Sequence, residues 1–231
     1  MTNQAQEAER IVLLEPVQRI SYAEKLIHDG ARDLHQGVVE KIKEKYANAP
    51  WANAYWQYNK ETGEINGSNF QLMVVANEVL APSKKRTLTF DEAMQLDKQG
   101  KLTNGVYRDL GLAIYSDGSP NKELATPLII EAQKRNWQLP ILAHPSSFVL
   151  KNKGLEFAFS EDDSLIIHGE QAKEALRRFS PVGYSGLRRL DRYRGGHWNA
   201  DWGVAGSSAS GRVDFVRAEG TRADFEARAL E

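Results

Sequence analysis

Residues 190–216 read LDRYRGGHWNADWGVAGSSASGRVDFV, and the interpretation of the fold depends on this stretch. Trp198 and Trp202 lie four residues apart among Gly, Ser, Ala, Asn, Asp, His and Tyr, and the stretch contains no Lys, Glu, Gln or Met. Tyr and Trp give contact area at low entropic cost, whereas Ser, Gly and Asn give adaptable hydrogen bonds. A catalytic segment normally carries a more committed set of acids, bases or nucleophiles. The composition therefore favours a binding surface, and a glycine-rich surface loop without a partner is the alternative.

The flanks of this stretch are typical of a strand scaffold. Leu187 and Leu190 are apolar and separated by arginines, and residues 212–216, RVDFV, alternate like a closing strand. We therefore expect fixed apolar positions on both sides of small or polar residues.

Residues 186–216, GLRRLDRYRGGHWNADWGVAGSSASGRVDFV, resemble the variable region of diversity-generating retroelement target proteins. Those are ligand-binding proteins of C-type lectin fold from phages, bacteria and archaeal viruses. In that family, adenines of a template repeat are mutated, and Asn codons become codons for residues such as Asp, Tyr, His, Ser, Gly, Val or Arg. RGGHWN also resembles the RGGSWN motif of lectin folds related to sulfatase-modifying enzymes. Those enzymes work through cysteines, which this chain lacks.

The resemblance implies an α+β fold, with a C-type-lectin-like domain and an N-terminal helical and strand extension. Residues 1–20 would be an N-terminal segment, residues 21–231 one lectin-like domain, and residues 187–216 its variable ligand-binding region. Trp198, Trp202 and Arg212 would be scaffold positions of the binding site. The diversified positions that contact ligand would be Asp191, Tyr193, Arg194, Gly195, His197, Asn199, Asp201, Gly203, Val204, Gly206, Ser208 and Ser210.

Composition sets further limits on function. The chain has 231 residues, 41% of them hydrophobic, and a formal net charge of −1, values that are ordinary for a folded domain. Such a balance argues against nucleic-acid binding, which usually leaves a basic excess. The short apolar run at residues 11–14 predicts neither a secretory signal nor membrane insertion. We expect synthesis in the cytoplasm and leave the final location open, a virion or cell surface included.

The sequence contains no catalytic or metal-binding motif that stands out. It has no cysteine, so thiolate zinc sites and cysteine nucleophiles are excluded. His28 and His35 are seven residues apart, about 10 Å along a helix and too far for one metal ion. HExxH, GxSxG and phosphate-loop spacings are missing, and the acidic run 161–163 reads as a solvated turn rather than a calcium site. We therefore predict a protein without catalysis or a required cofactor and assign no metal-binding residues; a lectin-like fold leaves calcium possible, although no sequence signature demands it.

The first half of the chain contains readable elements. Periodicity predicts a helix from Ser21 to Tyr46, capped by Ser21 and weakened by its glycines. Aromatic residues within 51–58 indicate a core or subunit contact, with a stacking platform as the alternative. Residues 59–64 form a predicted turn between strands, the second of which covers 69–80. Thr89 and Glu92 have the spacing of a capping box, which opens a helix to Leu96 that ends at Gly100.

The second half reads as strand 105–115, a helix before Asn136 and an extended stretch 139–149. The helix buries Leu124, Leu128, Ile129 and Ala132. This order fits either a parallel crossover unit or two antiparallel strands flanking a helix. Residues 154–159 are expected to pair with 164–167, and residues 169–179 to form another helix.

Two other functions compete with ligand binding. One is an α/β enzyme or nucleotide-binding protein that uses residues 105–149, with Asp109, Asp117 and His144 near strand ends. The other is a virion structural or assembly protein. For the favoured hypothesis the partner is an unknown protein or other surface ligand, and a homo-oligomer stays open.

Overall fold

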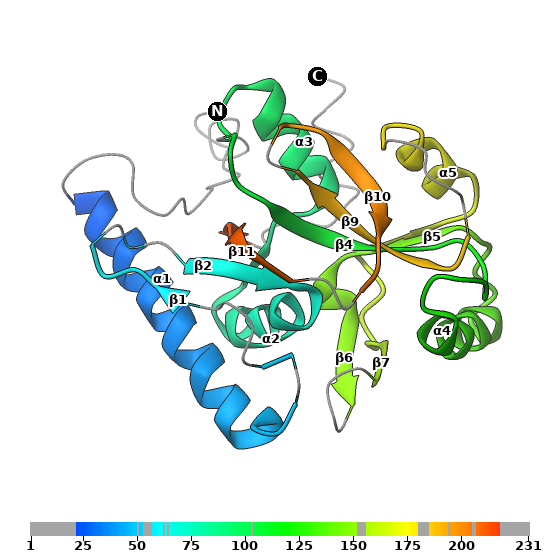
Figure 1. Ribbon diagram of the computed structural model, residues 1–231, viewed down its shortest axis with the longest axis horizontal. Coiled ribbons are helices and arrows are strands. Elements are labelled where there is room, and N and C mark those ends of the chain that lie inside the picture. The colour runs from blue at the N-terminus through cyan, green and yellow to red at the C-terminus, as the bar shows by residue number, and fades with distance from the viewer. Residues whose placement is uncertain are drawn as a thin grey trace, which may run out of the picture.

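The computed structural model describes residues 22–49, 51–52, 57–61, 63, 65–102, 104–151, 156–179, 185–193, 195–204 and 207–217. These residues form a mixed α+β structure built around an antiparallel sheet (Figure 1). The α+β class expected from the sequence is therefore confirmed. The proposed cap at Ser21 and the apolar run 11–14 lie outside the described residues.

The central sheet has the order β10-β9-β4-β5-β8. Its strands are β4 (Arg108–Ile114), β5 (Ile141–Ala143), β8 (Ile166–His168), β9 (Leu187–Arg192) and β10 (Trp198–Trp202). Each pair of neighbours is antiparallel. Strands β4 and β5, which flank a helix, are thus antiparallel, and the parallel crossover alternative is wrong.

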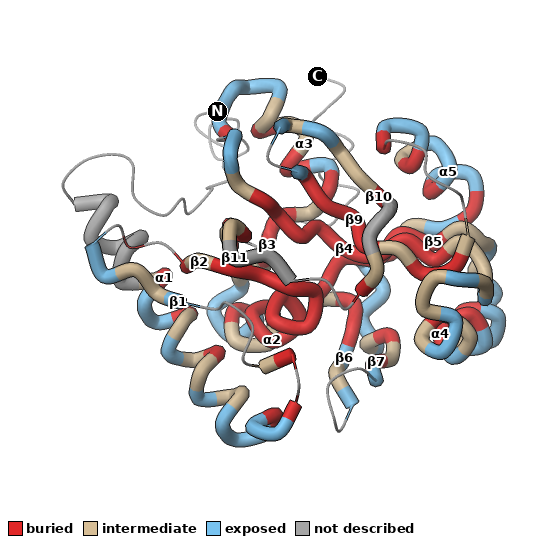
Figure 2. Tube along the Cα trace, in the orientation of Figure 1, coloured by how far each residue is buried: buried red, intermediate tan, exposed pale blue. Residues whose placement is uncertain are grey.

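Helices cover both faces of this sheet. Leu112 and Ile114 pack on one face with Leu128 of α4 (Lys122–Lys134). Leu110 and Leu190 pack on the other face against α3 (Phe90–Lys98) and α5 (Glu170–Leu176). Because both faces are covered, all seven residues of β4 are buried (Figure 2).

Helix α1 (Tyr22–Lys41) continues into a π-helical turn, Ile42–Tyr46, and runs unbroken through both of its glycines. A Cβ at Gly37 would lie 2.6 Å from Cγ1 of Val79 in α2 (Phe70–Leu80). Gly37 therefore permits close approach of the two helices. At Gly30 the same addition meets open space.

The predicted second strand at residues 69–80 is wrong in most of its length. Only Asn69 belongs to β2 (Ile65–Asn69), which pairs with β1 (Gln57–Tyr58) across the predicted turn. The following residues form α2, whose first turn is capped by the Asn69 side chain accepting from the Leu72 N–H at 2.8 Å. Helix α2 is buried on almost all sides, so its sequence shows no amphipathic period.

The four helices predicted within the described residues are confirmed as α1, α3, α4 and α5, and α3 shows its signal best. Thr89 N donates to Glu92 Oε2 at 2.9 Å, and Glu92 N donates to Thr89 Oγ1 at 3.3 Å, which completes the capping box. In α4 the expected face is buried at Leu128, Ile129 and Ala132. The preference for a core role is confirmed for Trp51, which is buried against Tyr46; Tyr55 and Trp56 lie outside the described residues.

The expected pairing of 154–159 with 164–167 is wrong. Strand β7 (Glu156–Phe159) pairs instead with β6 (Phe148–Lys151), and β8 pairs with β5. Aromatic packing explains the choice, because Phe148 lies 5.3 Å, centroid to centroid, from both Phe157 and Phe159.

Smaller elements complete the architecture. Strand β11 (Ser207–Arg212) joins β2 in a separate sheet, and β12 (Phe215–Arg217) pairs with β3 (Lys85–Thr87). Short 3₁₀ turns occupy Ala81–Ser83 and Pro145–Ser147. Among the described helices, none has the length and apolar character needed to span a bilayer.

Candidate functional site

The predicted variable region, residues 187–216, contains strands β9, β10 and β11 and the start of β12, which belong to three sheets. Strands β9 and β10 form a hairpin at one edge of the central sheet, whereas β11 pairs with β2 (Figure 1). The hairpin turn is closed by Tyr193 N donating to His197 O at 2.8 Å and Gly196 N donating to Tyr193 O at 2.9 Å. Gly196 has φ +82°, a left-handed conformation that favours glycine, so the glycine at this position favours the turn.

Among the described residues of this hairpin, Tyr193, Gly195 and His197 are exposed and Asn199 of β10 is half-buried; we call these four residues the hairpin tip. The Tyr193 side chain is large and 43% exposed. A Cβ at Gly195 would lie 3.1 Å from Cδ2 of His197, so the imidazole lies beside the glycine. The tip thus offers a phenol, an imidazole and an amide, which donate and accept hydrogen bonds and give contact area.

Two predicted contact positions are buried and cannot touch a ligand in the folded protein. Asp191, at 0% exposure, lies opposite Asp109 of β4 in the strand register. Val204, also at 0%, packs in the core cluster that contains Leu112. The neighbours of Asp191, Leu190 and Arg192, are buried as well, because both faces of the central sheet are covered along this part of β9.

The remaining predicted positions divide into three groups. Gly203 and Ser210 are half-buried, and Ser210 lies on β11, away from the hairpin turn in the chain. For Asp201, Trp202 and Ser208 the backbone lies in strands, but their side chains are outside the described part. Arg194 and Gly206 are outside it entirely. The scaffold residue Arg212 donates from Nη1 to its neighbour Gly211 O at 2.9 Å.

Arg192 of β9 connects the hairpin to helix α3. Its side chain is 2% exposed, and Nη2 lies 2.5 Å from Asp97 Oδ1 of α3 and 2.8 Å from Asn104 Oδ1. The guanidinium also lies 5.9 Å from the ring centre of Trp198, which in turn meets Phe90 edge-on at 5.9 Å. The scaffold role predicted for Trp198 therefore fits its contacts, and Arg192 adds an ionic anchor.

A second buried polar cluster lies at the base of the hairpin, around Asp109. Its carboxylate accepts from Ser68 Oγ at 2.7 Å and from the Tyr107 hydroxyl at 3.0 Å, and lies 3.2 Å from Arg189 Nε. Arg189 also lies over the Tyr107 ring, 4.7 Å from its centre. Burial, followed by the nearby Asp109 carboxylate, raises the pKa of Tyr107 well above its ordinary value, so the phenol stays protonated. The cluster joins β2, β4 and β9.

Sequence reasoning missed this cluster. Residues 187–192, LRRLDR, carry four charges in six positions, a pattern that normally indicates a solvated strand. The partners lie far away in the sequence, in β2 and β4. No local signal pairs them.

The residues of the competing enzyme hypothesis do not gather into one site. Asp109 lies near the start of β4, and Asp117 lies beyond its end. The strand from Asp109 to Ile114 alone is roughly 17 Å long at the usual rise per residue. His144 is buried: Nδ1 lies 2.7 Å from Ser146 Oγ, and Nε2 lies 3.1 Å from both Thr87 Oγ1 and Leu88 O. Burial, followed by the charge of Arg86, lowers the pKa of His144 to about 3. This histidine is a neutral hydrogen-bonding centre of the core.

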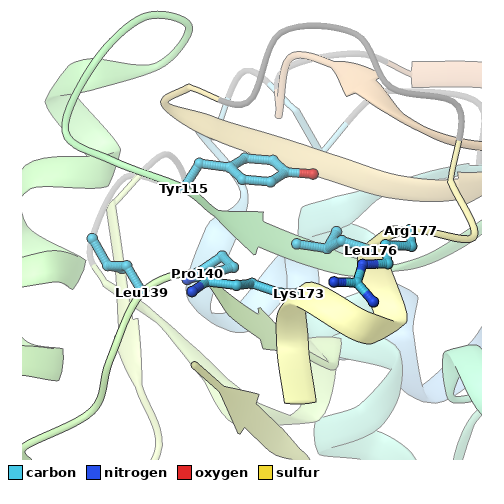
Figure 3. Close-up of a pocket in the computed structure, with 6 residues that line it drawn as sticks. All are labelled: Tyr115, Leu139, Pro140, Lys173, Leu176 and Arg177. Carbon is cyan, nitrogen blue, oxygen red and sulfur yellow. The ribbon is translucent and has the colours of Figure 1, made fainter. Parts of the chain in front are cut away.

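Two cavities flank α5. One, of about 580 Å³, lies between α3, α5 and the sheet. The other, of about 420 Å³, lies where β4 ends and β5 begins, and Figure 3 shows the Tyr115 hydroxyl directed toward Leu176 and Arg177 across it. The hairpin tip lines neither cavity. Within the described ranges, no group of three or more metal-ligating side chains occurs.

The chain matches no protein-family model, and no curated protein or solved structure matches it. The chemistry that the hairpin tip supports is noncovalent recognition. Its exposed groups are hydrogen-bonding and aromatic, and they stand on a base in which Arg192 is paired with Asp97 and Arg189 with Asp109.

Proposed function

We propose that the protein is a noncatalytic ligand-binding protein whose β9–β10 hairpin presents a variable recognition face. One observation carries this proposal: an exposed tip of small and aromatic residues stands on a base that is buried and ion-paired. Changes at Tyr193 or His197 would alter what the face binds, while Arg192 and the Asp109 cluster hold the backbone in place. Such preorganisation lowers the entropic cost of binding.

The resemblance of residues 186–216 to retroelement target proteins supports variation at this face. The RGGHWN motif, together with the α+β architecture, supports a domain of C-type lectin type. The expected ligand is a protein or other molecule displayed on a surface. Aromatic and imidazole anchors such as Tyr193 and His197 would supply most of the binding energy, since a few residues commonly dominate an interface. No cofactor is expected, and a virion or cell surface is the proposed location.

The decisive experiment is to sequence the DNA that flanks the gene. We expect a near-copy of the segment encoding residues 187–216, differing from it at adenines, beside a reverse transcriptase gene. The differences should fall on the codons of tip residues. A genome that lacks both the repeat and the reverse transcriptase would refute diversification.

A display library tests binding independently of gene context. Tyr193, Gly195, His197 and Asn199 are randomised together, and the library is selected against several unrelated proteins. We expect folded members and specific binders. A control library that randomises the buried Asp191 and Val204 should mostly unfold. Loss of folding in the tip library, or the absence of any binder from it, would contradict a tolerant recognition face.

A further inference from the structure

The larger cavity is an open groove between α3 and α5, with the central sheet as its floor. We call it the α3–α5 groove. Leu110, Leu142 and Leu190, contributed by β4, β5 and β9, form an apolar floor. Phe90 and Met94 of α3 form one apolar wall. Its volume of about 580 Å³ is within the range of small-molecule sites, roughly 300–1,000 Å³.

Several charged groups of the groove are already neutralised. Arg86 makes a bidentate pair with Glu92, with both N–O distances 2.6 Å. Glu174 is paired with Arg177 on the exposed surface of α5. His144, which also lines the groove, is neutral at physiological pH because its pKa is lowered by burial and by Arg86.

Two cations at the mouth of the groove are not neutralised. Within the described part of the chain, neither Lys98 nor Arg178 has a carboxylate partner. Arg178 Nη1 lies 3.6 Å from the sulfur of Met94, a weak acceptor, and Met94 is one helical turn before Lys98. The two cations therefore flank the same stretch of α3. Against them stands one further acid of the lining, Asp91, in the first turn of α3.

We propose that the α3–α5 groove binds a small amphiphilic carboxylate from solution, with its hydrocarbon chain on the leucine floor and its carboxylate at Lys98 and Arg178. Burial of the chain supplies the apolar part of the free energy. The carboxylate gains charge-assisted hydrogen bonds from Lys98 and Arg178, which have no carboxylate partner among the described residues. The proposal is independent of the recognition face, because no hairpin-tip residue lines the groove.

The smaller cavity of Figure 3 does not offer the same chemistry. Its cations are Lys173 and Arg177, and these are paired with Glu170 and Glu174 respectively. An anion would have to displace those carboxylates. The α3–α5 groove therefore differs from the smaller cavity in the ion pairing of its cations as well as in its volume.

The test is calorimetric titration of the full chain with dodecanoate below its micellar concentration. We expect saturable binding near one equivalent. Butanoate, with the same charge and a shorter chain, should bind at least about tenfold more weakly, as should the cationic dodecyltrimethylammonium. Equal binding of the cationic amphiphile would overturn the proposal, because an apolar surface alone would then account for it.

Charge-reversal variants locate the site. Arg178→Glu and Lys98→Glu should each weaken dodecanoate binding by about tenfold or more, as loss of a charge-assisted hydrogen bond implies. Lys101→Glu is the matched control, because it makes the same net-charge change three residues from Lys98 but does not line the groove. Undiminished dodecanoate binding in a variant that carries both Lys98→Glu and Arg178→Glu would refute the assignment of the carboxylate site. So would sedimentation showing self-association that Arg178→Glu abolishes, since the groove would then hold a second copy of the chain.

Discussion

Acidification between pH 7 and pH 5 should destabilise the protein through His144. The neutral ring accepts at Nδ1 from the Ser146 backbone N–H, 3.2 Å away, and its Nε2–H is placed to donate to Leu88 O. Protonation of Nδ1 removes that acceptor and places a charge in the core near Arg86. The folded-state pKa of about 3 lies below the unfolded value near 6.5, so the unfolded state binds the proton first.

The sign and size of the effect follow from linkage. The contribution of His144 to the free energy of unfolding is fully present above pH 6.5. It falls by about 1.4 kcal/mol per pH unit as the pH decreases toward 3. Between pH 7 and pH 5 the loss from this residue is about 2 kcal/mol. Carboxylates contribute little in this window, since their ordinary pKa values are near 4.

Urea unfolding followed by tryptophan fluorescence measures this loss. His144→Asn removes the titration while its amide oxygen can still accept from the Ser146 N–H. The difference in stability between pH 7 and pH 5 should shrink by about 2 kcal/mol in this variant. His168→Asn, at an exposed histidine, is the control and should keep most of the wild-type dependence. Equal pH dependence in wild type and His144→Asn would refute the assignment.

Two further predictions concern packing and burial. Gly30→Ala should stabilise the protein by about 0.5–1 kcal/mol, whereas Gly37→Ala should destabilise it because its Cβ would lie 2.6 Å from Val79. Thermal unfolding of the two variants measures both effects. Equal shifts of the melting temperature would contradict close packing at Gly37. Asp109→Ala should cost about 3 kcal/mol or more, because it leaves the buried Arg189 without its ion-pair partner, while Tyr193→Ala should stay within about 0.5 kcal/mol in urea titrations. A large loss in Tyr193→Ala would show that the tip is structural.

Elements with local signals could be predicted from the sequence. The capping box at Thr89 and Glu92 marks α3 because both of its hydrogen bonds lie within one turn. The apolar face of α4 appears in the sequence because one side of that helix meets solvent. Helix α2 has no such contrast: it is enclosed on nearly all sides, and a continuous apolar run does not distinguish a buried helix from a buried strand.

Local sequence patterns likewise predicted only part of the candidate site. The composition of residues 190–216 identified Tyr193 and His197, which are exposed at the hairpin tip. It misplaced Asp191, because the reason for its burial lies elsewhere in the chain. Arg189 and Asp109 meet only after β9 and β4 have paired, so no local pattern marks the interior position of an aspartate in a strand that carries three arginines.

Strand β9 serves two regions of the molecule at once. Leu190 lines the α3–α5 groove, and Arg192, roughly 7 Å farther along the strand, holds the hairpin by pairing with α3. Helix α3 likewise contributes Met94 and Asp97 to the two regions. A ligand in the proposed groove and a ligand at the proposed recognition face would therefore act on the same two elements. Whatever free energy one ligand gains by favouring a position of α3 against β9, the other must gain or lose in equal amount.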